Sequence, residues 1–142
     1  MIDTKTAPYA ALILRVALGT MLVAHALLKV FVFTLPGTVQ FFQSLGLPSV
    51  LAYVTVGAEL VGGVLLILGV GTRWVAAALV PILIGATWVH AGNGWLFSAP
   101  KGGWEYPAFW TVTLIVQALL GDGAYALGNR LAGRPAARLQ AA

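Results

Sequence analysis

Residues 7–33 read APYAALILRVALGTMLVAHALLKVFVF, and this stretch decides the fold. Most of its side chains are apolar, and three basic ones interrupt it: Arg15, His25 and Lys29. A helix of about 20 apolar residues crosses a hydrocarbon core about 30 Å thick. The stretch therefore predicts a transmembrane helix over about residues 8–33.

Three further apolar runs follow, at about residues 49–70, 74–91 and 106–127. The whole chain is 60% hydrophobic and only 8% charged, whereas a soluble domain has about 25% charged residues. Backbone groups in lipid must be satisfied within the segment, which favours helices. We predict an all-α fold, an integral membrane four-helix up-down bundle forming one domain over residues 1–128, followed by a basic tail at 129–142.

The first loop on the outer side, about residues 36–45, mixes Val39, Phe41, Phe42 and Leu45 with polar residues. This mixture predicts a short helix lying in the membrane interface. An ordered loop without a helix stays open as the alternative.

Basic residues set the expected orientation. An even number of spans places both termini on one side, together with Lys5, Arg73, Arg130, Arg134 and Arg138. Because cytoplasmic loops carry the excess of lysine and arginine, we expect both termini to be cytoplasmic. Arg15 interrupts the first apolar run early, which disfavours a cleaved signal peptide.

Composition also excludes several kinds of site. The chain has no cysteine, so disulfides, iron–sulfur clusters and thiolate zinc sites are excluded, and we predict no metal site. The net charge is +4, but the basic residues form no patch, which argues against nucleic acid as a partner.

Ionisable residues inside the spans mark functional sites by default. Arg15, His25 and Lys29 fall on one stripe of the first helix, at about 100° per residue, and should face the bundle interior. Glu59 lies about 15 Å from either end of the second span and needs a cation. We predict an Arg15–Glu59 ion pair. Snorkelling to the headgroups is the alternative for Arg15 and Lys29.

A second group of polar and aromatic residues lies toward the outer ends of the spans. We predict that it forms a ligand-binding polar pocket at the outer mouth of the bundle, with Trp110 nearby. Glu105 has an alternative role, because an acid at a helix N-terminus is favoured by the dipole. The predicted pocket residues are His25, Lys29, Glu59, His90, Trp104, Glu105, Tyr106 and Gln117.

The order and spacing of several motifs resemble the DoxX family of small four-helix membrane proteins. The motifs are Arg15-x3-Gly19, His25-x3-Lys29, Gly46-Leu47-Pro48, Glu59-x2-Gly62-Gly63, Leu65-Leu66-x-Leu68-Gly69, Thr72-Arg73, His90, Gly103-x-Glu105-Tyr106 and Gly121-x-Gly123. Two positions depart from the family pattern. Ala26 stands where a glycine is usual, and Ala126-Leu127-Gly128 replaces a segment that ends in an acid.

The resemblance implies a bundle in a bacterial-type inner membrane and a link to quinone-dependent redox complexes, as an accessory subunit. Its expected partners are the lipid bilayer, another membrane or redox protein, and further copies of the chain. The alternative is a non-catalytic scaffold or assembly factor whose buried charges are structural. A quinone is the expected cofactor. His25 and His90 on different helices could also ligate a haem b, but two hydrogen-bonded histidines in a polar cavity are the favoured interpretation.

Overall fold

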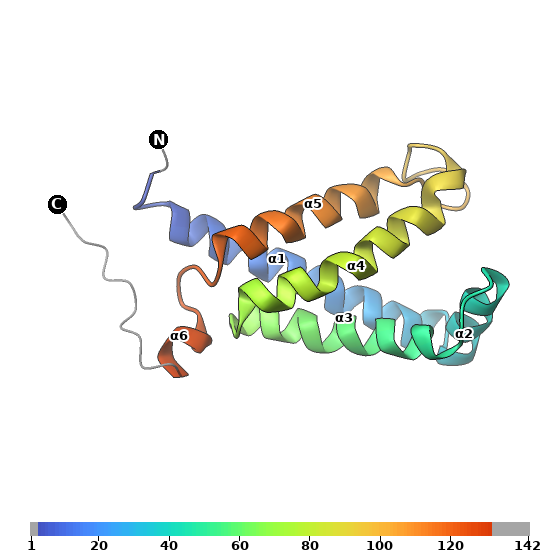
Figure 1. Ribbon diagram of the computed structural model, residues 1–142, viewed down its shortest axis with the longest axis horizontal. Coiled ribbons are helices and arrows are strands. Elements are labelled where there is room, and N and C mark those ends of the chain that lie inside the picture. The colour runs from blue at the N-terminus through green and yellow to red at the C-terminus, as the bar shows by residue number, and fades with distance from the viewer. Residues whose placement is uncertain (1–2, 132–142) are drawn as a thin grey trace.

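The computed structural model describes residues 3–131, and within that range it is all helical. Four long helices run lengthwise and alternate in direction (Figure 1): α1 (Ala7–Leu27), α3 (Val50–Leu68), α4 (Thr72–His90) and α5 (Glu105–Leu120). A short helix, α2 (Leu35–Ser44), lies at one end of the molecule, and another, α6 (Leu127–Leu131), lies at the other. The predicted all-α fold is confirmed, and it is a helical membrane bundle.

Among residues 3–131, three helical segments are long and apolar enough to cross a membrane: Ala7–Val32, Val50–Leu68 and Thr72–Asn93. They agree closely with the first three predicted spans. The fourth predicted span, 106–127, extends too far, because α5 ends at Leu120. Gly121 follows with a φ of 81°, which turns the backbone out of the helix. That α5 crosses the bilayer stays a prediction.

The first span changes helix type before it ends. Residues Leu28–Val32 form a π-helical turn, η1, in which the N–H of Phe33 donates to the carbonyl of Leu28 at 3.0 Å. α2 follows almost at once, and the short helix predicted for the first outer loop is therefore present. A 3-10 turn, η2 (Ala91–Asn93), extends α4 in the same way.

The long helices pack mainly as two antiparallel pairs, α1 with α3 and α4 with α5. In the first pair two glycines face each other. A Cβ built on Gly19 would lie 2.6 Å from the carbonyl oxygen of Gly63, and one on Gly63 would lie 2.8 Å from that of Gly19. Only glycine allows this approach, so the two positions fix the register of α1 against α3.

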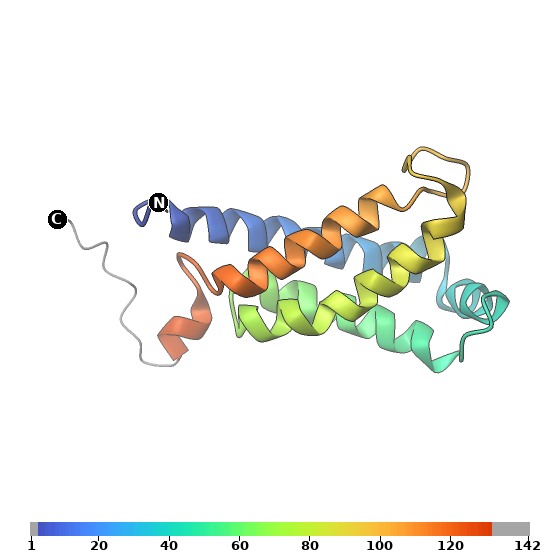
Figure 2. The ribbon, with the colours of Figure 1, turned by 45° about the horizontal axis from the view of Figure 1, so that its top comes forward.

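The two pairs share one apolar core. α4 and α5 diverge from α3 toward the end that carries α2 (Figures 1 and 2). The buried apolar side chains join the two pairs, and they are Leu18, Leu22, Leu66, Ala76, Leu79, Leu83, Trp110 and Leu114.

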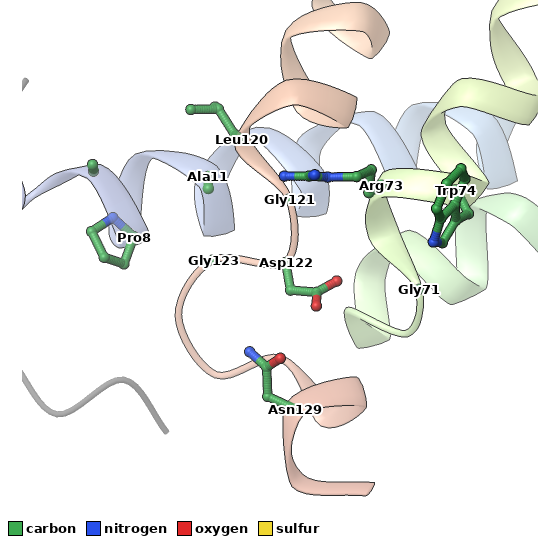
Figure 3. Close-up of a pocket in the computed structure, with 11 residues that line it drawn as sticks. Pro8, Ala11, Gly71, Arg73, Trp74, Leu120, Gly121, Asp122, Gly123 and Asn129 are labelled. Carbon is green, nitrogen blue, oxygen red and sulfur yellow. The ribbon is translucent and has the colours of Figure 1, made fainter. Parts of the chain in front are cut away.

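An open groove lies at the α6 end, between the starts of α1 and α4 and the segment after α5 (Figure 3). Asp122 and Arg73 face it, but both side chains bond to backbone groups. Asp122 Oδ1 accepts from the N–H of Thr72 at 3.1 Å, and Arg73 Nη2 donates to the carbonyl of Leu119 at 3.4 Å. Because its lining residues lie at the α6 end, the groove is at the opposite end of the bundle from the predicted outer pocket.

Candidate functional site

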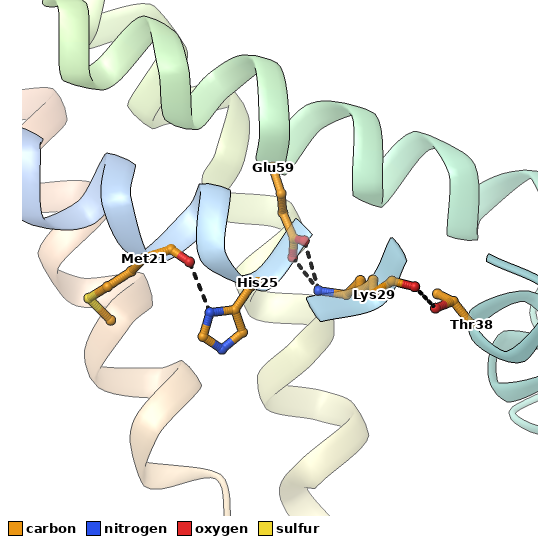
Figure 4. Close-up of polar contacts among 5 residues, drawn as sticks. All are labelled: Met21, His25, Lys29, Thr38 and Glu59. Carbon is orange, nitrogen blue, oxygen red and sulfur yellow. Dashed lines mark hydrogen bonds and ion pairs between the residues drawn. The ribbon is translucent and has the colours of Figure 1, made fainter. Parts of the chain in front are cut away.

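A partly buried ion pair links η1, at the end of the first span, to α3 near the α2 end. Lys29 Nζ donates to both carboxylate oxygens of Glu59, at 2.8 Å and 2.7 Å (Figure 4). The Glu59 side chain is 7% exposed and that of Lys29 is 20% exposed. Two charges held this way inside a span satisfy each other, and Lys29 stays the more accessible of the two.

The predicted Arg15–Glu59 pair is wrong, and the helix register explains why. Gly19 faces Gly63, so in this antiparallel pair Val23 lies level with Glu59. Along the helix, Arg15 is about 12 Å from that level toward the α6 end, and Lys29 is about 9 Å from it toward the α2 end. Side chains tilt toward the helix N-terminus, which carries Lys29 toward Glu59 and Arg15 away from it.

Arg15 instead ties the end of α3 to the segment after α5. Its Nη1 donates to the carbonyls of Leu66, at 3.0 Å, and Ile67. Its Nη2 donates to the carbonyl of Ala124 at 3.0 Å. The residue is 2% exposed. A guanidinium favours the unpaired carbonyls at a helix C-terminus, so Arg15 holds the α6 end of the bundle together.

His25 lies beside the ion pair and has one nitrogen committed to its own helix. Its Nδ1 contacts the carbonyl of Met21 at 2.9 Å (Figure 4). Since a carbonyl only accepts, Nδ1 must carry the proton, and in the neutral ring Nε2 is then the acceptor. His25 lies four residues before Lys29, so the two side chains lie on the same face of the first span, one turn apart.

Two aromatic side chains of α5 form a wall against His25. The ring of Tyr106 stacks on it with centroids 6.1 Å apart, and the ring of Trp110 meets it edge-on at 4.9 Å. Trp110 is 4% exposed, and its Nε1 has no hydrogen-bond partner among the described residues. The site thus combines an ion pair, an imidazole nitrogen that can accept a proton, and a buried donor within an aromatic wall.

A comparison with protein families matches the DoxX model over residues 10–92. The chain belongs to the DoxX family. The match includes Arg15, His25, Lys29 and Glu59, whereas the α5 wall lies outside it.

This DoxX protein is also similar to one named "Putative oxidoreductase CatD", from Bacillus subtilis (strain 168). The two are 45% identical over 65 residues, which are 46% of this chain and 47% of that relative. The match therefore spans about half the length of the curated relative. No solved structure matches the chain.

The DoxX bundle brings only part of the predicted pocket together. His25, Lys29, Glu59 and Tyr106 lie in the site described above. No contact joins His90 to these residues in the part of the chain that the structure describes: its Nδ1 contacts the carbonyl of Ala86 at 2.8 Å, and its ring lies close to Gly102.

The remaining predicted pocket residues have other partners. Glu105 Oε1 accepts from the N–H of Phe97 at 2.8 Å and so closes the loop before α5. Trp104 meets Trp95 edge-on at 4.6 Å. Gln117 is buried two turns beyond Trp110 and donates to the carbonyl of Gly121 at 2.8 Å, near the α6 end.

Sequence reasoning missed Thr38, whose hydroxyl donates to the carbonyl of Lys29 at 3.1 Å (Figure 4). Thr38 is 4% exposed and belongs to α2. A signal for it exists in the sequence, because Thr38 shares the spacing of the inward face of α2 with Leu35, Phe42 and Leu45. A polar residue on an apolar face needs a partner.

Proposed function

We propose that this DoxX protein is a quinone-linked accessory subunit of a membrane redox complex in a bacterial-type inner membrane. The observation that carries the proposal is the Lys29–Glu59 pair beside His25, inside a span and next to the aromatic wall of α5. Intramembrane ionisable groups of this kind serve ligand binding or proton exchange. The oxidoreductase name of the Bacillus subtilis relative supports the redox class.

The residues of the site fit a quinone headgroup. Such a ring needs hydrogen-bond partners that exchange protons, together with apolar walls for the ring and its tail. His25 Nε2 and the Lys29 ammonium supply polar partners, and Trp110 Nε1 is a buried donor that has no partner among the described residues. Tyr106 and Trp110 supply flat walls.

A bound quinol would supply two electrons and two protons. Glu59 can accept one proton once Lys29 turns away from it, and His25 Nε2 can accept the second. The sequence contains neither a cysteine nor a nucleotide-binding fingerprint, so in this proposal the two electrons of the quinol pass to a partner redox protein or to a second bound cofactor. Lys29 is more exposed than Glu59 and donates to both of its oxygens, so it can regulate access to the carboxylate.

The same proposal includes the orientation of the chain. Lys5 and Arg73 lie at the α6 end, and Lys101 lies at the α2 end. The sequence adds Arg130, Arg134 and Arg138 after α5. The excess of basic residues on that side supports cytoplasmic termini and a site near the outer leaflet.

The test is purification in a mild detergent, followed by extraction of quinones and titration with decylubiquinone. Wild-type protein should retain quinone and bind the probe. Glu59→Gln should lower the affinity by roughly tenfold, the effect of losing one charged hydrogen-bond partner. Asp3→Asn, at an exposed acid outside the spans, is the matched control and should bind like wild type. A wild-type protein that neither retains quinone nor binds decylubiquinone contradicts the proposal.

One observation favours a second candidate, a non-catalytic scaffold or assembly factor. Both oxygens of Glu59 accept from Lys29. A pair whose partners satisfy each other in this way can have a purely structural role, which is to fix the register of the two helices. In that case Glu59→Gln lowers the yield of folded protein or of its complex without a selective loss of quinone binding. Measuring yield and decylubiquinone affinity in the same preparation separates the two functions.

A further inference from the structure

α2 contacts the residue that completes the ion pair. Thr38 is the buried residue of this helix, and its hydroxyl donates to the carbonyl of Lys29. Hydrogen bonds from side chains of one element to the backbone of another fix how the two elements meet. α2 is therefore attached to the part of the first span from which the Lys29 side chain leaves.

Lys29 belongs to the π-helical turn η1 rather than to the regular part of α1. A π turn widens the backbone by one residue and changes the direction of the side chains that it carries. Such turns are rare in helices and are frequent at functional sites. The direction of the Lys29 side chain therefore depends on a backbone conformation that needs support.

The connection between η1 and α2 gives that support a fixed geometry. Thr34 has a φ of 63°, a conformation that strains a residue other than glycine. Its hydroxyl accepts from the N–H of Gly37 at 3.2 Å. Its carbonyl accepts from the N–H of Thr38 at 2.9 Å. These two bonds fix Thr34 to the first turn of α2, and the Thr38 hydroxyl fixes α2 to η1.

We infer that Thr38 is a positioning residue for the ion pair, and that α2 holds the Lys29 ammonium against Glu59 through the Thr38 hydroxyl. The inference rests on the proposed function only in that the ion pair is the proposed site. When α2 shifts, the hydrogen bond from the Thr38 hydroxyl to the Lys29 carbonyl breaks, and the Lys29 ammonium leaves Glu59 more often. The helix at the membrane surface then controls whether the buried carboxylate is free to act.

Amine labelling gives a direct test, because the three lysines are Lys5, Lys29 and Lys101. Reductive methylation of the intact protein in detergent, read by mass spectrometry, measures Lys29 relative to the other two as internal standards. Thr38→Val should raise the relative labelling rate of Lys29 by about fivefold, which corresponds to the loss of one hydrogen bond. Thr38→Ser keeps the hydroxyl and should restore the wild-type rate.

Two controls separate positioning from general loosening. Thr20→Val removes a hydroxyl that donates to the carbonyl of Val16 within α1, and it should leave Lys29 labelling unchanged. Glu59→Gln releases Lys29 directly and sets the upper limit of the rate. Thr38→Val should keep the wild-type circular dichroism, and its Lys5 and Lys101 rates should stay at the wild-type values, which shows that the protein has not loosened as a whole.

The outcomes distinguish this inference from the proposed function. An unchanged Lys29 rate in Thr38→Val, or a raised rate that Thr38→Ser does not restore, overturns the positioning role even when decylubiquinone binds. A raised rate in Thr38→Val that serine restores supports the positioning role even when the wild-type protein binds no quinone.

Discussion

Two cations on the first span, Arg15 and Lys29, lie about 21 Å apart along the helix and have different partners. Arg15 donates to backbone carbonyls of three residues, whereas Lys29 donates to a carboxylate. A guanidinium bound to carbonyls has no proton to exchange near neutral pH. A lysine–glutamate pair can exchange one. The comparison assigns Arg15 to holding the α6 end together and makes the ion pair at the α2 end the site of the proposed function.

Removing Lys29 should lower the stability of the protein more than any other substitution considered for the two cations. Lys29→Met leaves the Glu59 carboxylate buried without a cation, and we expect a loss of about 3–5 kcal/mol of stability. The double variant Lys29→Met with Glu59→Leu should recover most of it, because no unpaired charge remains. Thermal unfolding in detergent measures both. A double variant as unstable as the single one contradicts the ion pair as the cause.

Removing the arginine should have a smaller effect in a different place. Arg15→Met deprives the carbonyls of Leu66, Ile67 and Ala124 of their donors, at about 1–3 kcal/mol for a buried group left unsatisfied. Hydrogen exchange should rise in the segment after α5 and not around Glu59. Arg15→Lys should restore only part of the protection, because an ammonium lacks the planar fork of donors. Equal exchange at both ends would argue against separate roles.

The Gly19–Gly63 contact lies between the levels of Arg15 and Lys29, and the smallest substitution, the addition of one methyl group, tests whether it sets their different partners. Gly63→Ala places a Cβ against the backbone of Gly19, and overpacking of this kind costs about 1–3 kcal/mol. Gly57→Ala on the same helix is the control, since a Cβ there meets open space. We expect it to leave the thermal midpoint unchanged or to raise it. If both substitutions destabilise equally, the Gly19–Gly63 contact does not set the register.

The sequence was sufficient to predict the helices, but it was not sufficient to predict which charged side chains bind one another. Apolar runs predicted the first three spans to within a few residues, because length and hydropathy act locally. Angles around the first helix correctly placed Arg15, His25 and Lys29 on the inward side. The predicted depth of Arg15 relative to Glu59 was wrong. The register of α1 against α3 depends on one glycine contact, which the helical rise alone does not reveal.

The candidate site shows the same division. His25 and Tyr106 meet as expected, since residues near the same ends of neighbouring helices come together in an antiparallel bundle. Gln117 shares a face with Tyr106 but lies too far along α5 to reach the same place. The π turn at Lys29 arises from contacts between elements, and no periodicity predicts it. The spacing within α2 places Thr38 on the inward face, but it does not reveal that the partner of its hydroxyl is the Lys29 carbonyl.

The shortness of α5 has a consequence for the lipid around the protein. At 16 residues it is about 24 Å long, several ångströms less than a typical hydrocarbon core. A bilayer crossed by α5 must thin locally on that side or draw the polar ends of the helix inward, at a fraction of a kcal/mol per ångström. The protein would then favour thin membranes, and lipids with short acyl chains should gather beside α5.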